Sequence, residues 1–367
     1  MPYAHITGWG MAVPEPVLTN DDLAKMVETS DAWIRERTGI RERRIAREDE
    51  YPSTLAVEAS LKALRVANLR PTDLDLIICA TSTPEYIFPA TACLIQDQLG
   101  ATRAGAFDLL AACSGFIYAT NMAAQAIRSG SIKNALVVGA ETLSRFVNWK
   151  DRNTCILFGD GAGAFVLQAS ERPGGVLSAV MHSDGSGGNL LVLPAGGSRY
   201  PANESTVHDG KHYIHMDGKE VFRFATRVMA QATYEALDAA GLTVEQVQWI
   251  VPHQANIRII EAAARGLKLP MERFIVNLDR YGNTSTASIP IAVVEAVESG
   301  KIKAGDKIVF VGFGAGLTWG ALAAEWTGPL PTKRPVHLEQ YRWYARVRSV
   351  IRRFIRFVEG ILFRREL

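Results

Sequence analysis

The sequence predicts an α/β fold of two similar halves in which layers of sheet and helix are stacked. Predicted helices alternate with short, continuously apolar runs, which are typical of strands that helices cover on both faces. Residues 63–78 also match 236–251 at a constant offset, with their apolar positions in register. A second internal similarity pairs residues 158–163 with 311–316, which are both predicted as glycine-rich turns between apolar strands. Such internal repetition indicates a duplicated unit.

The individual elements follow from local patterns along the chain. Helical periodicity predicts helices at 51–67, 115–129, 220–240 and 288–299. Continuous apolar runs predict strands at 76–80, 135–139, 249–251 and 307–312. We divide the chain into a first half at 1–170, a second half at 171–328, and a proline-containing linker with a basic amphipathic helix at 329–367.

Composition restricts the class of protein. The chain has 367 residues, 48% of them hydrophobic and 21% charged, which is typical of a soluble globular protein. Its start lacks the pattern of a signal peptide, and no apolar run reaches the roughly 18 residues of a membrane-spanning helix. We therefore expect a cytoplasmic protein. The cysteines at 79, 93, 113 and 155 are far apart, which favours neither a disulfide framework nor a zinc site.

Charge is unevenly distributed. Residues 333–367 contain ten Lys or Arg and three Glu, whereas the rest of the chain is slightly acidic. The tail is therefore electrostatically separate from the body. The body is not basic enough to indicate a nucleic-acid-binding protein.

Cys113 is the first candidate catalytic residue. It lies where an apolar strand-like run turns into an apolar helix. Unpaired backbone N–H groups and the helix dipole at this position favour the thiolate, so we expect a pKa below the usual value of about 8.5. The alternative is a buried structural cysteine.

His253 and Asn283 are the second and third candidates. His253 follows a predicted buried strand that ends at Pro252, with a helix starting near Asn256, and α/β folds place chemistry at such strand ends. Asn283 lies in a polar, glycine-containing loop before the helix at 288–299. The alternatives are a histidine bonded to neighbouring backbone, and an asparagine that caps a helix or forms an Asx turn.

Together these three residue types allow two reactions. A thiolate can be acylated while His Nε2–H and the Asn amide donate to an enolate oxygen, which suits carbon–carbon bond formation by decarboxylation. A cysteine hydrolase uses the same types, with Asn orienting His. Composition alone does not separate the two.

The sequence lacks the motifs that would indicate several classes of ligand. The glycine turns at 159–163 and 312–316 allow close backbone approach to a ligand and an oxyanion hole, but neither fits a dinucleotide or phosphate-binding loop. We expect no nucleotide redox cofactor. Of His208, His212 and His215, the last two lie on a predicted strand, and Asp209-Gly210 disfavours a helix that would align all three, so we expect no metal.

Six ordered segments carry a resemblance to a known family: WIRERTGIRER (33–43), AACSGF (111–116), FGDGAG (158–163), VPHQANIR (251–258), YGNTS (281–285) and GFGAGLTW (312–319). The chain resembles 3-oxoacyl-[acyl-carrier-protein] synthase III of the thiolase-like superfamily over about residues 3–326. The resemblance implies a five-layer αβαβα sandwich of two pseudo-symmetric halves, forming a homodimer. It also implies a cofactor-independent decarboxylating Claisen condensation of a short acyl-CoA with malonyl-acyl-carrier protein, which initiates fatty-acid synthesis.

The resemblance also assigns roles to residues. Cys113 would be the nucleophile, His253 and Asn283 would stabilise the enolate, and the N–H groups of Cys113 and Ala315 would form the oxyanion hole. Phe88 would enter the acyl pocket across the dimer. The residues matching coenzyme A and pantetheine contacts are Trp33, Arg37, Arg152 and Asn256. Those matching the carrier-protein surface are Gln254, Ala255, Asn256, Ile257, Arg258, Arg223 and Arg265.

The family does not account for the tail. Pro329, Pro331 and Pro335 predict a stiff linker, and apolar residues at helical spacing predict an amphipathic helix from Leu338 onwards with arginines around it. We expect weak contact with an anionic membrane surface. Packing on the body or on the dimer partner, and a carrier-protein contact, are the alternatives.

Two other functions stay open. One is a related thiolase-fold ketosynthase or acyltransferase of specialised metabolism, which shares the three catalytic residue types. The other is a non-catalytic acyl-binding module, against which the presence of all three residues argues. The sequence does not indicate whether acetyl or branched primers are preferred.

Overall fold

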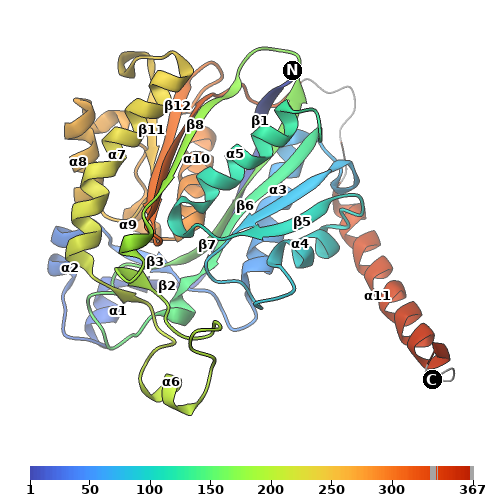
Figure 1. Cartoon of the computed structure of the whole chain (residues 1–367), viewed down its shortest axis with the longest axis horizontal. Coiled ribbons are helices and arrows are strands. Elements are labelled where there is room, and N and C mark those ends of the chain that lie inside the picture. Colours follow the sequence, from blue (N-terminus) through green and yellow to red (C-terminus); the bar gives the residue numbers. More distant parts are fainter. Residues whose placement is uncertain (331–335, 337, 364–367) are drawn as a thin grey trace.

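The computed structural model describes residues 1–330, 336 and 338–363, which form two stacked sheets with helices between and around them (Figure 1). The first sheet has the order β1-β7-β6-β4-β5, in which β4 runs parallel to β5 and β6 while β7 is antiparallel to β1 and β6. Its strands are β1 (Tyr3–Ala12), β4 (Leu76–Ala80), β5 (Gly105–Leu109), β6 (Asn134–Thr142) and β7 (Asp160–Ser170).

The second sheet has the order β11-β12-β13-β8. The pair β11 and β12 is parallel, and the other two pairs are antiparallel. Its strands are β8 (Gly175–Ser183), β11 (Trp249–Pro252), β12 (Lys307–Gly314) and β13 (Thr318–Glu325).

Helices separate and cover the two sheets, so that five layers result (Figure 1). The middle layer is α5 (Gly115–Arg128) with α10 (Ser288–Glu298). Helices α3 (Pro52–Ala67) and α4 (Thr91–Leu99) cover the first sheet, whereas α7 (Gly218–Ala240) covers the second with α8 (Ile257–Leu267) beside it. The predicted αβαβα sandwich is confirmed.

Aromatic side chains fill the space between the sheets. The ring of Phe165 lies 5.0 Å from that of Phe116 on the middle helix and 5.8 Å from that of Phe310 on the second sheet. All three are fully buried. Because burial of one such side chain contributes about 1.5–3 kcal/mol, this contact ties the halves firmly together.

Shorter elements connect these layers. The remaining strands are β2 (Val17–Thr19), β3 (Glu42–Arg44), β9 (Leu191–Val192) and β10 (His215–Met216). The remaining helices of the body are α1 (Asn20–Ala24), α2 (Asp31–Thr38), α6 (Glu204–His208) and α9 (Leu278–Tyr281). Single 3₁₀ turns are η1 (Pro71–Asp73), η2 (Ala112–Ser114), η3 (Leu143–Phe146), η4 (Gly185–Gly187), η5 (Val244–Gln246), η6 (Met271–Arg273) and η7 (Ser285–Ala287).

The repeated segments fold alike. The first copy runs from the end of α3 through η1 into β4, and the second from the end of α7 through η5 into β11. The two glycine-rich segments 158–163 and 311–316 were both predicted as turns between strands, but they take different places in the fold. Residues 158–163 lead into and begin β7, whereas residues 311–316 end β12. The strand expected around 212–215 is reduced to the two residues of β10.

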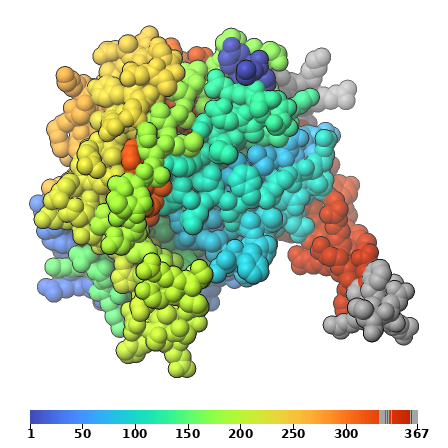
Figure 2. Space-filling view, viewed as in Figure 1, coloured from blue at the N-terminus to red at the C-terminus, as the bar shows by residue number. Residues whose placement is uncertain are grey.

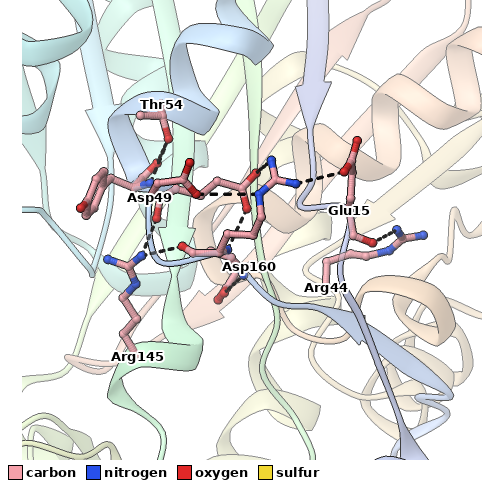
Figure 3. A network of polar contacts seen from close by, with 10 residues as sticks. Glu15, Arg44, Asp49, Thr54, Arg145 and Asp160 are labelled. Atoms are coloured by element: carbon pink, nitrogen blue, oxygen red, sulfur yellow. Dashed lines mark hydrogen bonds and ion pairs between the residues drawn. The ribbon is translucent and has the colours of Figure 1, made fainter.

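The glycine segment 159–163 serves packing rather than ligand binding, which corrects that prediction. A Cβ atom at Gly159 would lie 2.3 Å from the Tyr281 carbonyl oxygen, and one at Gly163 would lie 2.7 Å from Pro290 of α10. The neighbouring Asp160 carboxylate accepts the backbone N–H groups of Ala46 and Ser144 (Figure 3). The glycine contacts hold the start of β7 against the second half of the chain, and the Asp160 bonds tie it to loops of the first half.

The C-terminal helix α11 (Leu338–Phe363) begins on the body and then extends away from it (Figures 1 and 2). Its predicted start at Leu338 is confirmed. The linker residues 331–335, which include Pro331 and Pro335, lie outside the described residues, as do 364–367. Among the described helices, none is long and apolar enough to cross a membrane.

Candidate active site

Cys113 lies in the turn that joins the first sheet to the middle helix layer. Strand β5 ends at Leu109, and η2 carries Cys113 directly into α5. The residue before it, Ala112, has φ of 45°, a conformation that L-residues rarely adopt. Such a backbone persists at functional sites when the surroundings hold it.

The surroundings that hold Cys113 come from the second sheet. The Thr318 hydroxyl lies 3.0 Å from the carbonyl oxygens of both Ala111 and Ala315, and 2.7 Å from the Ser114 hydroxyl. At Gly314, a Cβ atom would lie 2.6 Å from the Cys113 nitrogen, so only glycine allows this approach. The Gly314–Ala315 segment therefore packs directly against the turn that carries Cys113.

Cys113 is buried, with only 7% of the residue exposed. Burial raises its pKa to about 12, while a hydrogen bond with the Ser285 side chain acts in the opposite direction. The prediction of a lowered pKa was therefore wrong. Loss of hydration outweighs the helix N-terminus because the charged thiolate is the form that burial disfavours.

His253 follows β11, as predicted, and is buried. Its backbone N–H bonds the Val311 carbonyl, and its Nδ1 lies 2.7 Å from the Ser288 hydroxyl. Burial lowers the pKa of His253 to about 3, so the ring is neutral at ordinary pH. When the Ser288 hydroxyl donates to Nδ1, Nε2 carries the ring proton and can donate it to a substrate oxygen.

Asn283 has the Asx turn that was the alternative to a catalytic role. Its Oδ1 accepts the Ser285 backbone N–H at 2.8 Å, and its own backbone N–H bonds the Leu157 carbonyl. Because the amide oxygen is occupied in this way, the Nδ2 hydrogens remain the groups that can reach a substrate. The turn thus orients the amide rather than excluding a catalytic role.

The three candidate residues are brought to the same place by β12 and η7. A Cβ at Gly312 would lie 3.3 Å from the His253 Cβ, and Gly314, two residues on, contacts the Cys113 turn. The η7 turn, which begins two residues after Asn283, packs against η2, which carries Cys113. These packing contacts therefore bring the turns that carry Cys113, His253 and Asn283 close together.

The predicted coenzyme A residues also cluster, at the surface. The guanidinium carbon of Arg37 lies 4.5 Å from the centre of the Trp33 ring, and that of Arg152 lies 5.2 Å from it. Asn256 Nδ2 donates to the Arg37 carbonyl at 2.9 Å. A ring flanked by two guanidinium groups suits an adenine and its phosphates.

The predicted carrier-protein residues divide into two groups. Gln254 does not fit, because it is 1% exposed and its amide bonds the carbonyls of Pro252 and Ile275 and the Asn277 N–H. Ala255, Asn256 and Ile257 are half-buried, whereas Arg258 is exposed at the start of α8. Arg223 on α7 is already paired with Glu220 at 2.8 Å, and Arg265 follows on α8.

Phe88 and the edge strand β5 form an exposed apolar surface. Phe88 is 85% exposed, and Phe107 of β5 and Leu110 just after it are exposed as well. In the first sheet β5 has a neighbour on one side only. An unpaired apolar edge of this kind is typical of a pairing surface.

Several residues around the site were not found by sequence reasoning. Ser288 bonds His253 within the second half, whereas Thr318 bonds the Ala111 carbonyl and the buried Glu141 accepts the Thr286 hydroxyl across the two halves. The only available signal was a serine at the start of the helix at 288–299. Among the described residues, no group of His, Cys, Asp and Glu could hold a metal ion.

The layered fold and the Cys–His–Asn site define the class: a thiolase-fold acyltransferase. Two family models match, "3-Oxoacyl-[acyl-carrier-protein (ACP)] synthase III" over residues 107–185 and its "C terminal" counterpart over 237–326. The chain belongs to the 3-oxoacyl-[acyl-carrier-protein] synthase III family.

Curated relatives and solved structures agree with this membership. The chain is 54% identical over 325 residues to the beta-ketoacyl-[acyl-carrier-protein] synthase III of Roseiflexus sp. (strain RS-1). The aligned region covers 89% of this chain and 99% of that protein. It is 57% identical over 321 residues to the one from Symbiobacterium thermophilum, covering 88% and 97%. The crystal structure of 3-oxoacyl-[acyl-carrier-protein] synthase III from Aquifex aeolicus VF5 matches with a TM-score of 0.81 and 50% sequence identity. The match covers 88% of this chain and 99% of that one.

Proposed function

We propose that this protein condenses a short acyl-CoA with malonyl-acyl-carrier protein, releasing CO₂ and forming the 3-oxoacyl-carrier product that initiates fatty-acid synthesis. The observation that supports it is the juxtaposition of a buried thiol with a neutral histidine and an oriented asparagine amide. Residues 1–170 and 171–328 act as the two halves that meet at this site. No cofactor takes part.

The first half-reaction acylates Cys113. Its sulfur attacks the thioester carbonyl, and the negative oxygen of the tetrahedral intermediate lies between the backbone N–H groups of Cys113 and Ala315. Trp33 with Arg37 and Arg152 holds the nucleotide end of coenzyme A. Coenzyme A then leaves as its thiol.

The second half-reaction uses His253 and Asn283. Both donate to the thioester oxygen of the malonyl group, so the enolate that forms on loss of CO₂ is stabilised by two neutral donors. Neutral donors suit this step, because a positively charged histidine would transfer its proton to the enolate. The carbanion attacks the acyl group on Cys113, and the sulfur is released.

Product analysis tests the proposal against the acyltransferase alternative. The enzyme is incubated first with acetyl-CoA or isobutyryl-CoA and then with malonyl-acyl-carrier protein. The mass of the intact protein is measured after each step. An acyl adduct that is discharged together with CO₂ and a 3-oxoacyl-carrier product supports the synthase. An adduct that only hydrolyses, or moves to oxygen or nitrogen, contradicts it.

Arg258 offers a test of the carrier-protein surface. It is exposed at the start of α8, two residues after Asn256, and an acidic carrier protein would be attracted to it. We expect Arg258→Glu to raise the KM for malonyl-acyl-carrier protein about tenfold, with acylation from acetyl-CoA unchanged. Lys303→Glu, equally exposed but remote, is the matched control. Equal effects of the two substitutions would contradict the assignment.

We infer a homodimer from the exposed edge of the first sheet. Pairing of β5 with its counterpart in a second copy would bury Phe107 and Leu110 and would bring Phe88 to the neighbouring acyl pocket. The dimer is thus the arrangement in which Phe88 contributes to catalysis rather than to the protein surface.

We propose that α11 brings this otherwise cytoplasmic enzyme to an anionic membrane surface. The helix contacts α4 through a narrow face, on which Ala345 is buried and Ser349 donates to the Asp97 carboxylate at 2.7 Å. Helical geometry places a broad apolar stripe on the opposite side. Its exposed members are Trp343, Tyr344, Val347, Val350, Ile351, Phe354, Phe357 and Ile361.

This arrangement favours a lipid surface over packing on the body. The stripe points away from α4, and Phe354 and Phe357 are both 65% exposed. By helical position Arg346 and Arg353 flank one edge of the stripe, where they can reach lipid phosphates, and Arg353 also lies 3.9 Å from the Asp97 carboxylate. Exposed aromatic residues combined with arginines are typical of helices that lie in a membrane interface.

Flotation with vesicles tests the membrane proposal. We expect the full chain to float with vesicles containing phosphatidylglycerol at low salt, and not with pure phosphatidylcholine vesicles. Replacing both Phe354 and Phe357 with serine should abolish flotation without changing activity, while Lys303→Glu should not affect it. If the wild-type protein stays at the bottom of the gradient, or if α11 instead forms a larger assembly in solution, the proposal is wrong.

A further inference from the structure

Arg43 on β3 is a buried cation that the reaction above does not use. It is fully buried, and burial lowers its pKa to about 10, so the guanidinium group stays charged at neutral pH. Its hydrogen-bond acceptors in the described part of the chain are all neutral. Because removing a cation from water is costly when no carboxylate pairs with it, such a residue calls for an explanation beyond filling space.

The guanidinium group joins two segments that are far apart in the sequence. Nη1 donates to Asn20 Oδ1 at 2.9 Å and to the Leu18 carbonyl oxygen at 3.1 Å, at the junction of β2 and α1. Nη2 donates to the Ile156 carbonyl oxygen at 2.7 Å, in the segment that leads into β7. A planar guanidinium group makes such contacts in fixed directions, which a single ammonium group cannot do. Arg43 therefore fixes the position of the segment that contains Ile156.

This segment holds the backbone of Asn283. The Leu157 carbonyl oxygen accepts the Asn283 N–H at 2.8 Å, and the Gly159 N–H donates to the Asn283 carbonyl oxygen at 3.0 Å. Both main-chain polar groups of Asn283 are therefore bonded to the segment that begins at the carbonyl that Arg43 holds. A movement of residues 156–159 would move Asn283 with it.

The stem of Arg43 packs against the same region. A Cβ atom at Gly282, directly before Asn283, would lie 3.3 Å from the Arg43 Cβ, and one at Gly159 would lie 3.1 Å from it. The α9 helix, which ends just before Gly282, packs against β3. Arg43 thus contacts the Asn283 loop through its stem, and through its charged end it contacts the segment that pairs with this loop.

The direction of the Asn283 amide depends on this backbone. Oδ1 accepts the Ser285 N–H at 2.8 Å, which leaves the Nδ2 hydrogens for the enolate oxygen. A donor stabilises an enolate only when it lies within hydrogen-bond distance of the developing charge. A displacement of about 1 Å can therefore lower the rate about 100-fold.

Helix α2, which carries Trp33 of the predicted coenzyme A cluster, has support that does not require Arg43. Asn20 Nδ2 donates to Asp31 Oδ1 at 2.9 Å, at the start of α2, and to the Ile40 carbonyl oxygen at 2.8 Å, just beyond its end. These bonds remain when the guanidinium group is removed. We therefore expect acylation by acyl-CoA to depend less on Arg43 than decarboxylation does.

We propose that Arg43 is a positioning residue for Asn283, which it holds through the backbone of residues 156–159 in the orientation that stabilises the enolate. The inference rests on the proposed synthase activity and assigns Arg43 to its second half-reaction. When an apolar residue replaces Arg43, the Ile156 carbonyl loses its donor, and residues 156–159 can shift together with Asn283.

Rapid-quench measurement of acyl-enzyme formation from acetyl-CoA, and of CO₂ release by pre-acylated enzyme, tests the proposal. We expect Arg43→Met to lower decarboxylation about 30- to 100-fold while acylation changes less than about threefold. Arg43→Lys can still donate to Ile156, so it should lower decarboxylation only about fivefold. Arg44→Met is the matched control on the same strand, because Arg44 bonds the Glu15 carbonyl at the surface instead. It should leave both steps unchanged.

A double-substitution cycle separates the positioning of Asn283 from a general role in folding. In Asn283→Ala there is no amide to position, so adding Arg43→Met should slow decarboxylation less than about twofold further. Losses that add in full would show that Arg43 acts independently of Asn283 and would overturn the proposal. Equal slowing of the two half-reactions, or a wild-type rate of decarboxylation in Arg43→Met, would overturn it as well.

The conservative variant keeps the test decisive if Arg43→Met does not fold. Arg43→Lys is then measured in the same cycle, and the same outcomes decide. Failure of both variants to fold would overturn the proposal, because Arg43 would then serve the fold alone. A wild-type enzyme that is acylated but releases no CO₂ would contradict the proposed synthase activity, and this inference with it.

Discussion

Cys113→Ala should abolish the acyl-enzyme and lower condensation by at least about a thousandfold, because no other group at the site can hold the acyl chain. Intact-protein mass after incubation with acetyl-CoA measures the adduct directly. The remaining activity is followed by the release of CO₂ from malonyl-acyl-carrier protein. Removing the sulfur should leave the fold intact, since alanine is smaller and the turn is held by Thr318 and Gly314.

Cys93→Ala is the control for this substitution. Cys93 is exposed on α4, so it can react with acyl thioesters nonspecifically without taking part in catalysis. We expect Cys93→Ala to keep the full adduct and full activity. An adduct that persists in Cys113→Ala and disappears in Cys93→Ala would contradict the assignment of the nucleophile.

The ends of strands and the starts of helices were predictable from the sequence. His253 follows a strand that ends at Pro252, and Asn256 caps α8, as the local pattern indicated. Strand β4 was predicted with its observed bounds. These features depend on residues within one turn or strand, where proline, capping side chains and apolar periodicity act directly.

Features that depend on packing between distant residues were not predictable. The thiol of Cys113 has a raised pKa because both halves of the chain exclude water from it. Gln254 is buried because its amide satisfies backbone groups of β11 and the segment around Ile275. No local pattern reveals such burial, since it depends on what the fold places opposite each side chain.

The orientation of α11 illustrates the same limit. Periodicity predicted an amphipathic helix, but not which side contacts the body. The observed contact uses Ala345 against Gly100, where a Cβ would lie 2.9 Å from the alanine Cβ. This close approach requires a small residue both on α11 and at the end of α4, so the apolar stripe faces away from the body.

His253→Ala and Asn283→Asp should separate the two half-reactions. Asn283→Asp keeps an oxygen that accepts the Ser285 N–H, but it replaces the donor by an anionic oxygen that repels the enolate. We expect each substitution to lower decarboxylation about 100- to 1,000-fold while acylation by acetyl-CoA changes less than about threefold. Rapid-quench measurement of acyl-enzyme formation and of CO₂ release distinguishes the steps. His182→Ala, which removes a ring bonded to Glu235 outside the site, is the control.

The pH dependence of the second half-reaction provides a further check on His253. Burial lowers its pKa to about 3, so protonation would occur only far below the range in which an exposed histidine titrates. Decarboxylation by pre-acylated enzyme should therefore show no transition near pH 6.5 that depends on His253. A histidine that acted as a charged acid would instead give a rate that falls as pH rises through its pKa. A fall in the decarboxylation rate that is present in wild type and absent in His253→Ala would contradict the mechanism in which His253 acts as a neutral donor.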